Sequence, residues 1–169
     1  MNDRSAGTPA LRFLRAQGIA HEVHRYRHEP GTSDFGDEAA AQLTRLVGCD
    51  PSAIFKTLVW LVDGRACFAI APVTGQVAAK RLAAALDGRS AVLADEPTAR
   101  RISGSTLGAI SPIAPRRAVP VVIDVSAHDH DRVFLSAGQR GVEVALAPAD
   151  LIAATDATVA AIARGSRDS

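Results

Sequence analysis

Apolar positions along this chain occur in short runs separated by glycine, proline and small polar residues. Where they recur with helical spacing between capping residues, they predict helices over residues 9–17, 37–47, 77–86, 97–102, 148–153 and 158–163. Where the runs alternate or are rich in β-branched residues, they predict strands over residues 21–27, 53–62, 65–71, 90–94, 119–125, 132–136 and 142–146. Hairpins mixed with helices, without a regular strand–helix alternation, predict a single α+β domain with a mixed sheet.

Turn-forming residues predict the connections. Asp63-Gly64 separates two apolar runs by two residues, which is the sequence pattern of a β-hairpin. Residues 138–141 are also expected to form a turn, and residues 103–115 a longer loop. The polar tail, residues 165–169, is expected to fray.

Lys56 stands out because it interrupts the apolar run of residues 53–62. Among nineteen basic residues, only Lys56 and Lys80 are lysines. The two-residue period of a strand places Lys56 between Ile54 and Leu58 on one face, and both faces of the run look buried. The charge could protect a sheet edge or be solvated. It could instead meet a carboxylate, a phosphate or a carbonyl oxygen in a site, or act as a base or Schiff-base nucleophile at a depressed pKa.

The segment Gly108-Ala109-Ile110-Ser111-Pro112 is a second candidate site. Gly104 and Gly108 have no side chain and would let backbone N–H groups approach a ligand, while Pro112 would stiffen the exit of the loop. A glycine-containing loop taken alone can equally be an ordinary turn.

Composition narrows the class of protein. The chain has 169 residues, 47% hydrophobic residues and a net charge of +1, which argues against the strongly basic face of a general nucleic-acid binder. Arginine pairs at 25/27, 100/101 and 116/117 are either local RNA contacts or solvated surface. No apolar stretch is long enough to span a bilayer. Charged residues interrupt the first thirty positions, and Cys49 and Cys67 are isolated, so we expect a cytoplasmic protein with reduced thiols.

The histidines do not predict a metal site. Along a strand, His24 and His28 face one way and His21 the other, which spoils a three-ligand arrangement. His128 and His130 lie in a charged loop. The chain also lacks a phosphate-binding loop, a dinucleotide fingerprint and a nucleophile elbow. We therefore expect neither a metal nor an organic cofactor.

Five short blocks in this order resemble the YbaK family of free-standing aminoacyl-tRNA deacylases, which is related to the editing domain of bacterial prolyl-tRNA synthetases. The blocks are His24-Arg25-Tyr26-Arg27-His28, Phe35-Gly36-Asp37-Glu38, Phe55-Lys56-Thr57-Leu58, Gly108-Ala109-Ile110-Ser111-Pro112, and Ser136-Ala137-Gly138 with Arg140-Gly141. Each block is weakly specific alone, but five in register are strong, and the resemblance extends from about Thr8 to Arg164.

The resemblance implies a barrel-like mixed sheet flanked by short helices and a site with no cofactor. It implies that Lys56 is required for activity and that Gly108 lies by the aminoacyl group. It also implies a substrate pocket lined by residues of the matching blocks, namely Tyr26, Phe35, Thr57, Ile110, Ser111, Pro112 and Ser136. Glu143 is a further implied substrate contact: close members of the family have aspartate there, so the same charge sits on a side chain longer by one methylene.

The implied substrate is tRNA(Pro) mischarged with cysteine, with prolyl-tRNA synthetase as a possible partner and no role for DNA or a membrane. The substrate thiol would attack its own ester carbonyl, or a polar residue such as Ser136 would orient a water molecule. The block Phe35-Gly36-Asp37-Glu38 favours cysteine. A deacylase for another small amino acid such as alanine and a non-catalytic module that binds the tRNA 3′ end remain alternatives. A lysine Schiff-base enzyme is a weaker one, because no second acid or base accompanies Lys56.

Overall fold

The hairpin predicted at Asp63-Gly64 forms the centre of the structure, a computed structural model that describes residues 7–165. Strands β2 (Phe55–Val62) and β3 (Arg65–Pro72) pair antiparallel along their full length. They lie inside a five-stranded mixed sheet of order β5-β2-β3-β6-β9, in which β6 runs parallel to both β3 and β9. The other strands of this sheet are β5 (Ala91–Leu93) and β9 (Thr158–Ala160) at its edges and β6 (Val121–Asp124) between β3 and β9.

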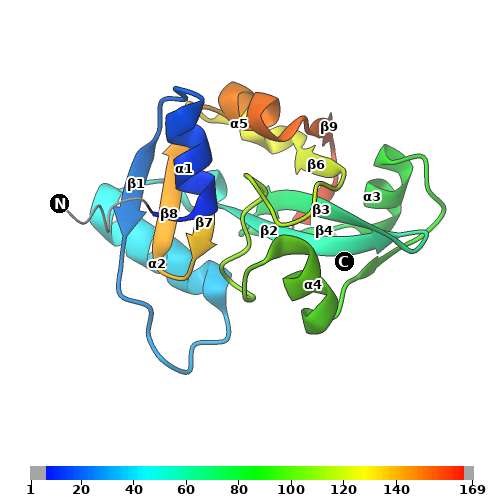
Figure 1. Cartoon of the computed structure of the whole chain (residues 1–169), viewed down its shortest axis with the longest axis horizontal. Helices are drawn as coiled ribbons and strands as arrows, with labels where there is room; N and C mark the ends of the chain where they lie inside the picture. Colours follow the sequence, from blue (N-terminus) through cyan, green and yellow to red (C-terminus); the bar gives the residue numbers. More distant parts are fainter. Residues whose placement is uncertain (1–6, 166–169) are drawn as a thin grey trace.

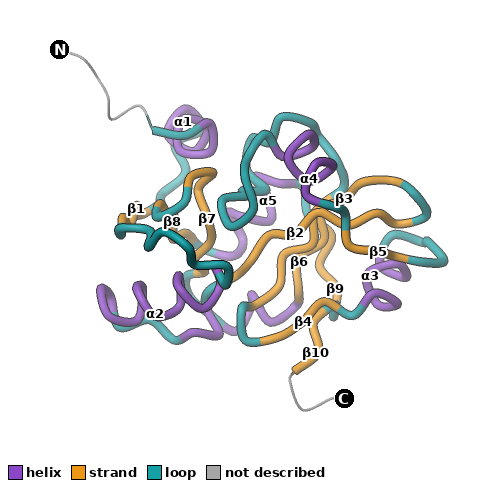
Figure 2. Tube along the Cα trace, turned by 90° about the horizontal axis from the view of Figure 1, so that it is seen from below, coloured by secondary structure: helices purple, strands orange, loops and turns teal. Residues whose placement is uncertain are grey.

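A second sheet has three antiparallel strands in the order β1-β8-β7. These strands are β1 (Glu22–Arg25), β8 (Val142–Leu146) and β7 (Val133–Gln139). The helices α1 (Pro9–Ala16) and α2 (Phe35–Val47) cover its two faces (Figure 2). On one face Leu11 and Leu14 enter the largest core cluster, and on the other Leu43 packs with Phe134.

The remaining elements surround the five-stranded sheet (Figure 1). They are α3 (Ala79–Ala85), α4 (Glu96–Ser103) and α5 (Pro148–Thr155), the 3-10 helices η1 (Pro51–Ala53) and η2 (Val125–Asp129), and a two-stranded ribbon of β4 (Gly75–Val77) and β10 (Ala163–Gly165). A parallel bridge between Ile54 and Phe134 joins the two larger sheets. The predicted α+β class with a mixed sheet is confirmed, and the molecule is a single domain. The strands do not close into a barrel: those of the described residues form three separate sheets.

Capping explains where the N-terminal helices begin. The Thr8 hydroxyl accepts a hydrogen bond from the Leu11 N–H at 3.3 Å, and Pro9 follows at the first helical position, as predicted. Helix α2 begins two residues before the predicted position, because the Asp34 carboxylate accepts from the Asp37 N–H at 3.1 Å. It ends at Gly48, whose φ of 64° is left-handed, as expected for a helix C-cap.

The prediction of a helix over residues 158–163 is wrong. Thr158 and Val159 belong to β9, and a buried carboxylate directs the chain that follows: Asp124 Oδ1 accepts from the Ile162 and Ala163 N–H groups at 2.9 and 2.8 Å. Such a long-range hydrogen bond overrides the local helical preference of the alanines. Of the tail that was expected to fray, Gly165 is the last residue of β10. The rest of that tail lies outside the described residues.

Two smaller predictions also need correction. Val77 ends the short strand β4 and does not begin a helix. Residues 138 and 139 extend β7 past a bulge, so the turn is confined to Arg140 and Gly141. Helices in the described range 7–165 are all too short or too polar to cross a membrane.

Candidate active site

A cavity that contains most of the predicted site residues lies at the free edge of β2. Strand β5 pairs only with residues 60–62, so none of the described strands pairs with residues 55–58 on that side. The cavity has a volume of about 300 Å³ and separates β2 from α2, from the loop before Ile110 and from the three-stranded sheet. Seven of the ten residues predicted for the site line it: Phe35, Lys56, Thr57, Gly108, Ile110, Ser136 and Glu143.

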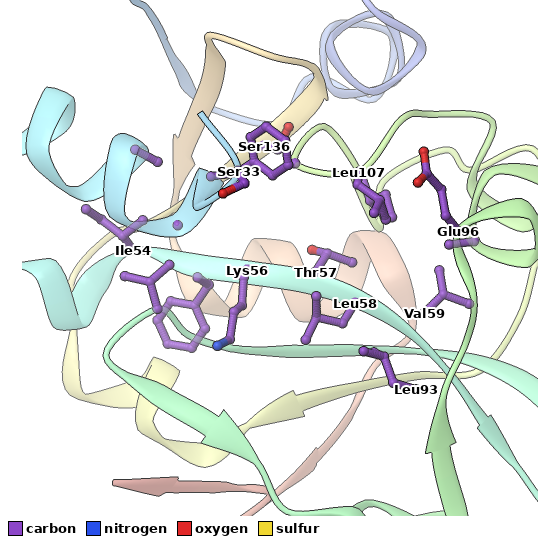
Figure 3. Close-up of a pocket in the computed structure, with 18 of the residues that line it drawn as sticks. Ser33, Ile54, Lys56, Thr57, Leu58, Val59, Leu93, Glu96, Leu107 and Ser136 are labelled. Carbon is purple, nitrogen blue, oxygen red and sulfur yellow. The ribbon is translucent and has the colours of Figure 1, made fainter. Parts of the chain in front are cut away.

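Lys56 is half-buried, and Figure 3 shows its side chain extending from β2. Its Nζ donates a hydrogen bond to the Gly75 carbonyl oxygen in β4 at 2.8 Å. Burial lowers the pKa of Lys56, and the nearby carboxylates of Asp34 and Asp37 partly oppose that shift. An ammonium has three N–H donors. The bond to Gly75 therefore fixes the position of the charge and leaves donors for a ligand.

Gly108 and Phe35 form one wall by close contact. Gly108 has a φ of +78°, and a Cβ added to it would lie 2.2 Å from the Phe35 ring. On the exposed side, the Arg140 guanidinium lies 4.4 Å from the centroid of the same ring. Arg140 Nε also donates to the Leu107 carbonyl oxygen at 2.9 Å. Three segments distant in sequence are thus held together, and only glycine fits at position 108.

Thr57 contributes a polar group that the protein does not satisfy. Its side chain is 8% exposed and lines the cavity, and its hydroxyl is one of the buried polar groups without a hydrogen-bond partner in the described residues. Ser136 lines the same cavity from β7, where its Oγ accepts from the Gly138 N–H at 3.4 Å. Because buried hydroxyls normally have a partner, the Thr57 hydroxyl is available to a ligand.

Glu143 is a nearly buried carboxyl group in the cavity wall. It is 4% exposed, and β8 places it directly opposite Ser136 in β7. Burial raises its pKa to about 8, although the hydrogen bond from the Tyr26 hydroxyl at 3.5 Å lowers it. Tyr26 does not line the cavity but supports Glu143 from behind, and burial and the carboxylates raise the pKa of Tyr26 as well.

The other candidates lie apart from this cavity. Ser111 is buried, accepts from the Ile113 N–H at 3.2 Å, and lines a separate depression near Gly104. Arg116 lies at that depression too, and the buried Pro112 is not in the main cavity wall. The sequence blocks therefore bring the lysine strand and the first half of the glycine loop to the cavity, but not the end of that loop.

The histidines are separated. The His28 ring pairs with Glu38 at 2.7 Å, His24 lies 3.3 Å from Glu22, and the His21 ring bonds the Ile19 carbonyl oxygen at 2.7 Å. Between residues 7 and 165 there is no group of three or more histidine, cysteine, aspartate or glutamate side chains placed to hold a metal ion.

Sequence reasoning missed several residues of the site. Leu93, Leu107 and Ser33 line the cavity, and Gly75 anchors the lysine. Leu107 could have been noticed as the neighbour of Gly108. Gly75 offered no local signal, because its contact with Lys56 joins residues nineteen positions apart in the sequence.

Comparisons with known proteins identify a family and a shared fold. A family model described as an aminoacyl-tRNA editing domain matches residues 36–154, well over half of the chain. A protein of Enterococcus faecalis, named as a candidate Cys-tRNA(Pro)/Cys-tRNA(Cys) deacylase, EbsC, is 26% identical over 125 residues, which are 73% of this chain and 76% of that protein.

Solved structures share the fold. The crystal structure of a candidate trans-editing enzyme for prolyl-tRNA synthetase aligns with a TM-score of 0.79 at 19% identity, over 93% of this chain and 96% of that one. A hypothetical protein of known structure aligns equally well, with a TM-score of 0.79 at 20% identity over 92% and 99% of the two chains.

The contact between Gly108 and Phe35 can be tested by substitution. Gly108→Ala should lower the free energy of unfolding by about 1–3 kcal/mol more than Gly18→Ala, because the new methyl group must displace the Phe35 ring. Gly18 is a matched control, with a φ of +65° and nothing within 4 Å of an added Cβ. Urea denaturation measures both. The difference should shrink when Phe35→Ala is combined with Gly108→Ala, and equal losses in the two single variants would contradict the contact.

The buried carboxyl of Glu143 should make stability depend on pH. Its pKa is raised from 4.5 to about 8, so the folded protein retains a proton that the unfolded chain loses. This contribution is present below pH 4.5 and is lost as the pH rises toward 8. The melting temperature of the wild type should therefore fall across that range relative to that of Glu143→Gln, which cannot ionise. If the melting temperatures of the two proteins changed in parallel with pH, the pKa of Glu143 would not be raised by burial.

Proposed function

Because the chain belongs to the aminoacyl-tRNA editing domain family, we propose that it deacylates mischarged tRNA(Pro), with cysteine as the preferred amino acid. Membership supports an aminoacyl-tRNA deacylase that acts on mischarged tRNA. The observation that carries the finer proposal is the anchored ammonium of Lys56 in the wall of a small cavity beside Gly108. The name of the Enterococcus faecalis relative supports cysteine and tRNA(Pro), and the prolyl-tRNA synthetase trans-editing fold supports the tRNA.

The residues support a site that binds the ester and supplies little chemistry of its own. The free donors of Lys56 would hydrogen-bond the ester carbonyl oxygen or the ribose and stabilise the negative charge that develops there. The Ala109 N–H already donates to the Thr106 carbonyl oxygen at 3.0 Å, so Gly108 is the better backbone candidate for a second donor. Thr57, Ser136 and the protonated carboxyl of Glu143 would position the amino and ester groups.

In the proposed reaction the substrate cysteine provides the nucleophile. Its sulfur attacks the carbonyl carbon of its own ester, a C–S bond forms, and the C–O bond to the ribose breaks. The thiol proton passes to the ribose oxygen, and the products are a cyclic thioester and uncharged tRNA. Holding the thiol and the carbonyl in a reactive geometry is sufficient catalysis for such an intramolecular step. In the competing route, Ser136 orients a water molecule and the product is free cysteine.

A tRNA substrate would also determine where the protein acts and which protein it meets. We expect the protein to act in the cytoplasm, where tRNA is charged, and to meet its substrate after prolyl-tRNA synthetase releases or presents it.

Replacing Lys56 should abolish deacylation while leaving the fold intact. Lys56→Ala is expected to lower the single-turnover rate on Cys-tRNA(Pro) by roughly 100-fold or more, since it removes an electrostatic donor from the site. Lys80→Ala is the matched control, because Lys80 is the other lysine of the chain and is exposed on α3. Circular dichroism and thermal unfolding check that both variants fold. Full activity of folded Lys56→Ala would refute the proposed role.

A panel of mischarged tRNAs should separate the possible substrates and routes. We expect Cys-tRNA(Pro) to be deacylated faster than Ala-tRNA(Pro) and Ser-tRNA(Pro), because only cysteine carries a thiol. Thin-layer chromatography of the released product distinguishes the cyclic thioester from free cysteine. Preferential turnover of Ala-tRNA(Pro) would instead identify an alanine deacylase, and tight binding of all three without turnover would identify a binding module.

A further inference from the structure

A second depression lies next to the cavity that contains Lys56. It has a volume of about 350 Å³ and is lined by the start of α1, the end of α4, the loop after α4 and the bulge of β7. Figure 2 shows α1 and α4 on the same side of the molecule, with this loop between them. Ser111 lines the depression, whereas Ile110, its neighbour in the chain, lines the cavity. The end of the glycine loop, which the proposed function does not use, therefore contributes to a separate hollow, the Arg116 depression.

Arg116 gives this depression its charge. It is the one charged residue among the described residues that line the hollow, and it forms no ion pair with any residue between 7 and 165. Packing nevertheless holds its side chain across Gly104: a Cβ added to Gly104 would lie 3.2 Å from Arg116 Cβ and 3.3 Å from Nε. Its backbone N–H also donates to the Ser103 carbonyl oxygen at 3.2 Å. A guanidinium that is held in place without an acidic partner is available to an anion.

The polar groups around Arg116 that remain free are donors. The last carbonyl oxygens of α4 already bind the backbone N–H groups of residues 116 and 117, at 3.2 and 3.1 Å, and the Ser103 hydroxyl donates within α4 at 2.7 Å. Ser111 is 5% exposed, and its Oγ accepts from the Ile113 N–H, but none of the described residues accepts its hydroxyl hydrogen. Because buried hydroxyls normally use their hydrogen, that of Ser111 is available to an acceptor on a ligand.

We propose that the Arg116 depression binds a backbone phosphate of the tRNA substrate, within the single-stranded end that leads to the esterified ribose. The inference rests on the proposed function, which places that ribose in the adjacent cavity. A phosphodiester offers one negative charge and acceptor oxygens, which match a guanidinium and a hydroxyl donor. The glycine loop and β7 each contribute residues to both hollows, so one strand of RNA can reach the two together.

The charge of the whole chain makes a single contact of this kind measurable. The net charge of +1 indicates few phosphate contacts, because a protein that binds RNA through a broad basic face has a large excess of lysine and arginine. Each phosphate contact adds to the dependence of binding on salt concentration. The loss of one contact among few therefore changes that dependence by a large fraction.

The test measures binding of uncharged, fluorescently labelled tRNA(Pro) by anisotropy over a range of KCl concentrations. We expect Arg116→Ala to weaken binding roughly tenfold. The slope of log K against log[KCl] should become shallower by about 0.7–1, as for the loss of one phosphate contact. Arg116→Lys should keep the wild-type slope but bind more weakly than the wild type, because lysine keeps the charge without the planar fork of arginine.

Arg89→Ala is the matched control. It removes the same charge from an exposed arginine whose backbone N–H donates to Asp63, beside the turn of the β2–β3 hairpin, and which does not line the depression. Its affinity and slope should equal those of the wild type. Circular dichroism and thermal unfolding check that each variant is folded.

A second arm of the experiment locates the phosphate. The last three phosphodiesters of the tRNA are replaced, one at a time, by a neutral methylphosphonate linkage. The wild type should lose affinity at one of these positions. Arg116→Ala should lose no more at that position, because the contact is already absent.

Several results would overturn the inference: no binding of tRNA(Pro) by the wild type, an unchanged slope in Arg116→Ala, an equal loss in Arg89→Ala, or the same methylphosphonate losses in the wild type and Arg116→Ala. Calorimetric binding of inorganic phosphate that Arg116→Ala abolishes, with tRNA binding unchanged, would identify a site for a free anion and overturn the assignment to RNA.

These measurements do not require turnover. A protein that shows the expected effects at Arg116 but leaves every mischarged tRNA intact would refute the proposed deacylation and leave the phosphate site standing. A protein that deacylates Cys-tRNA(Pro) but binds tRNA equally well with and without Arg116 would refute the phosphate site alone.

Discussion

The hydrogen bond from Lys56 Nζ to the Gly75 carbonyl oxygen is the constraint on which the site depends. An ammonium in an apolar strand needs an acceptor, or the strand cannot remain buried on that side. The acceptor lies on β4, which pairs with β10 near the C-terminus. Gly75 is pressed against that strand, since an added Cβ would lie 2.9 Å from the Arg164 carbonyl oxygen. The buried carboxylate of Asp124 in turn fixes the start of β10. The position of the charge is therefore determined by residues far from it in the sequence.

The opposite wall of the cavity is also fixed by contacts between segments that are distant in the sequence. Phe35 occupies the space that a side chain at Gly108 would fill, and Arg140 covers the ring while bonding the Leu107 carbonyl oxygen. A helix N-terminus, a loop and a β-turn are thereby fixed relative to one another. The pairing of His28 with Glu38 holds the same helix terminus to the chain after β1. Rigid placement of this kind suits a site whose proposed contribution is orientation.

Local sequence signals predicted the elements that begin or end at distinctive capping or turn residues. Thr8-Pro9, Asp63-Gly64 and Gly48 were sufficient to place a helix, a hairpin and a helix end. The C-terminal region was mispredicted because its alanines favour a helix locally, whereas Asp124, nearly forty residues earlier, binds its backbone. For a related reason, the sequence predicted only some of the residues of the site. Blocks that carry a special residue, such as Lys56 or Gly108, can be recognised in the sequence, but Leu93 and Gly75 become part of the site only through tertiary packing.

Glu143 shows how the cavity could contain a carboxyl group beside the proposed reaction, in which negative charge develops on the ester. An ionised carboxylate facing the ester would oppose the charge that forms on the carbonyl oxygen. Burial avoids this, because it raises the pKa of Glu143 to about 8 and keeps the group protonated at neutral pH. A protonated carboxyl can donate a hydrogen bond toward the cavity. The Tyr26 hydroxyl donates a hydrogen bond to one of its oxygens. Burial thus sets the charge of this side chain, and in the proposed reaction the ammonium of Lys56 would act on the ester beside a neutral Glu143.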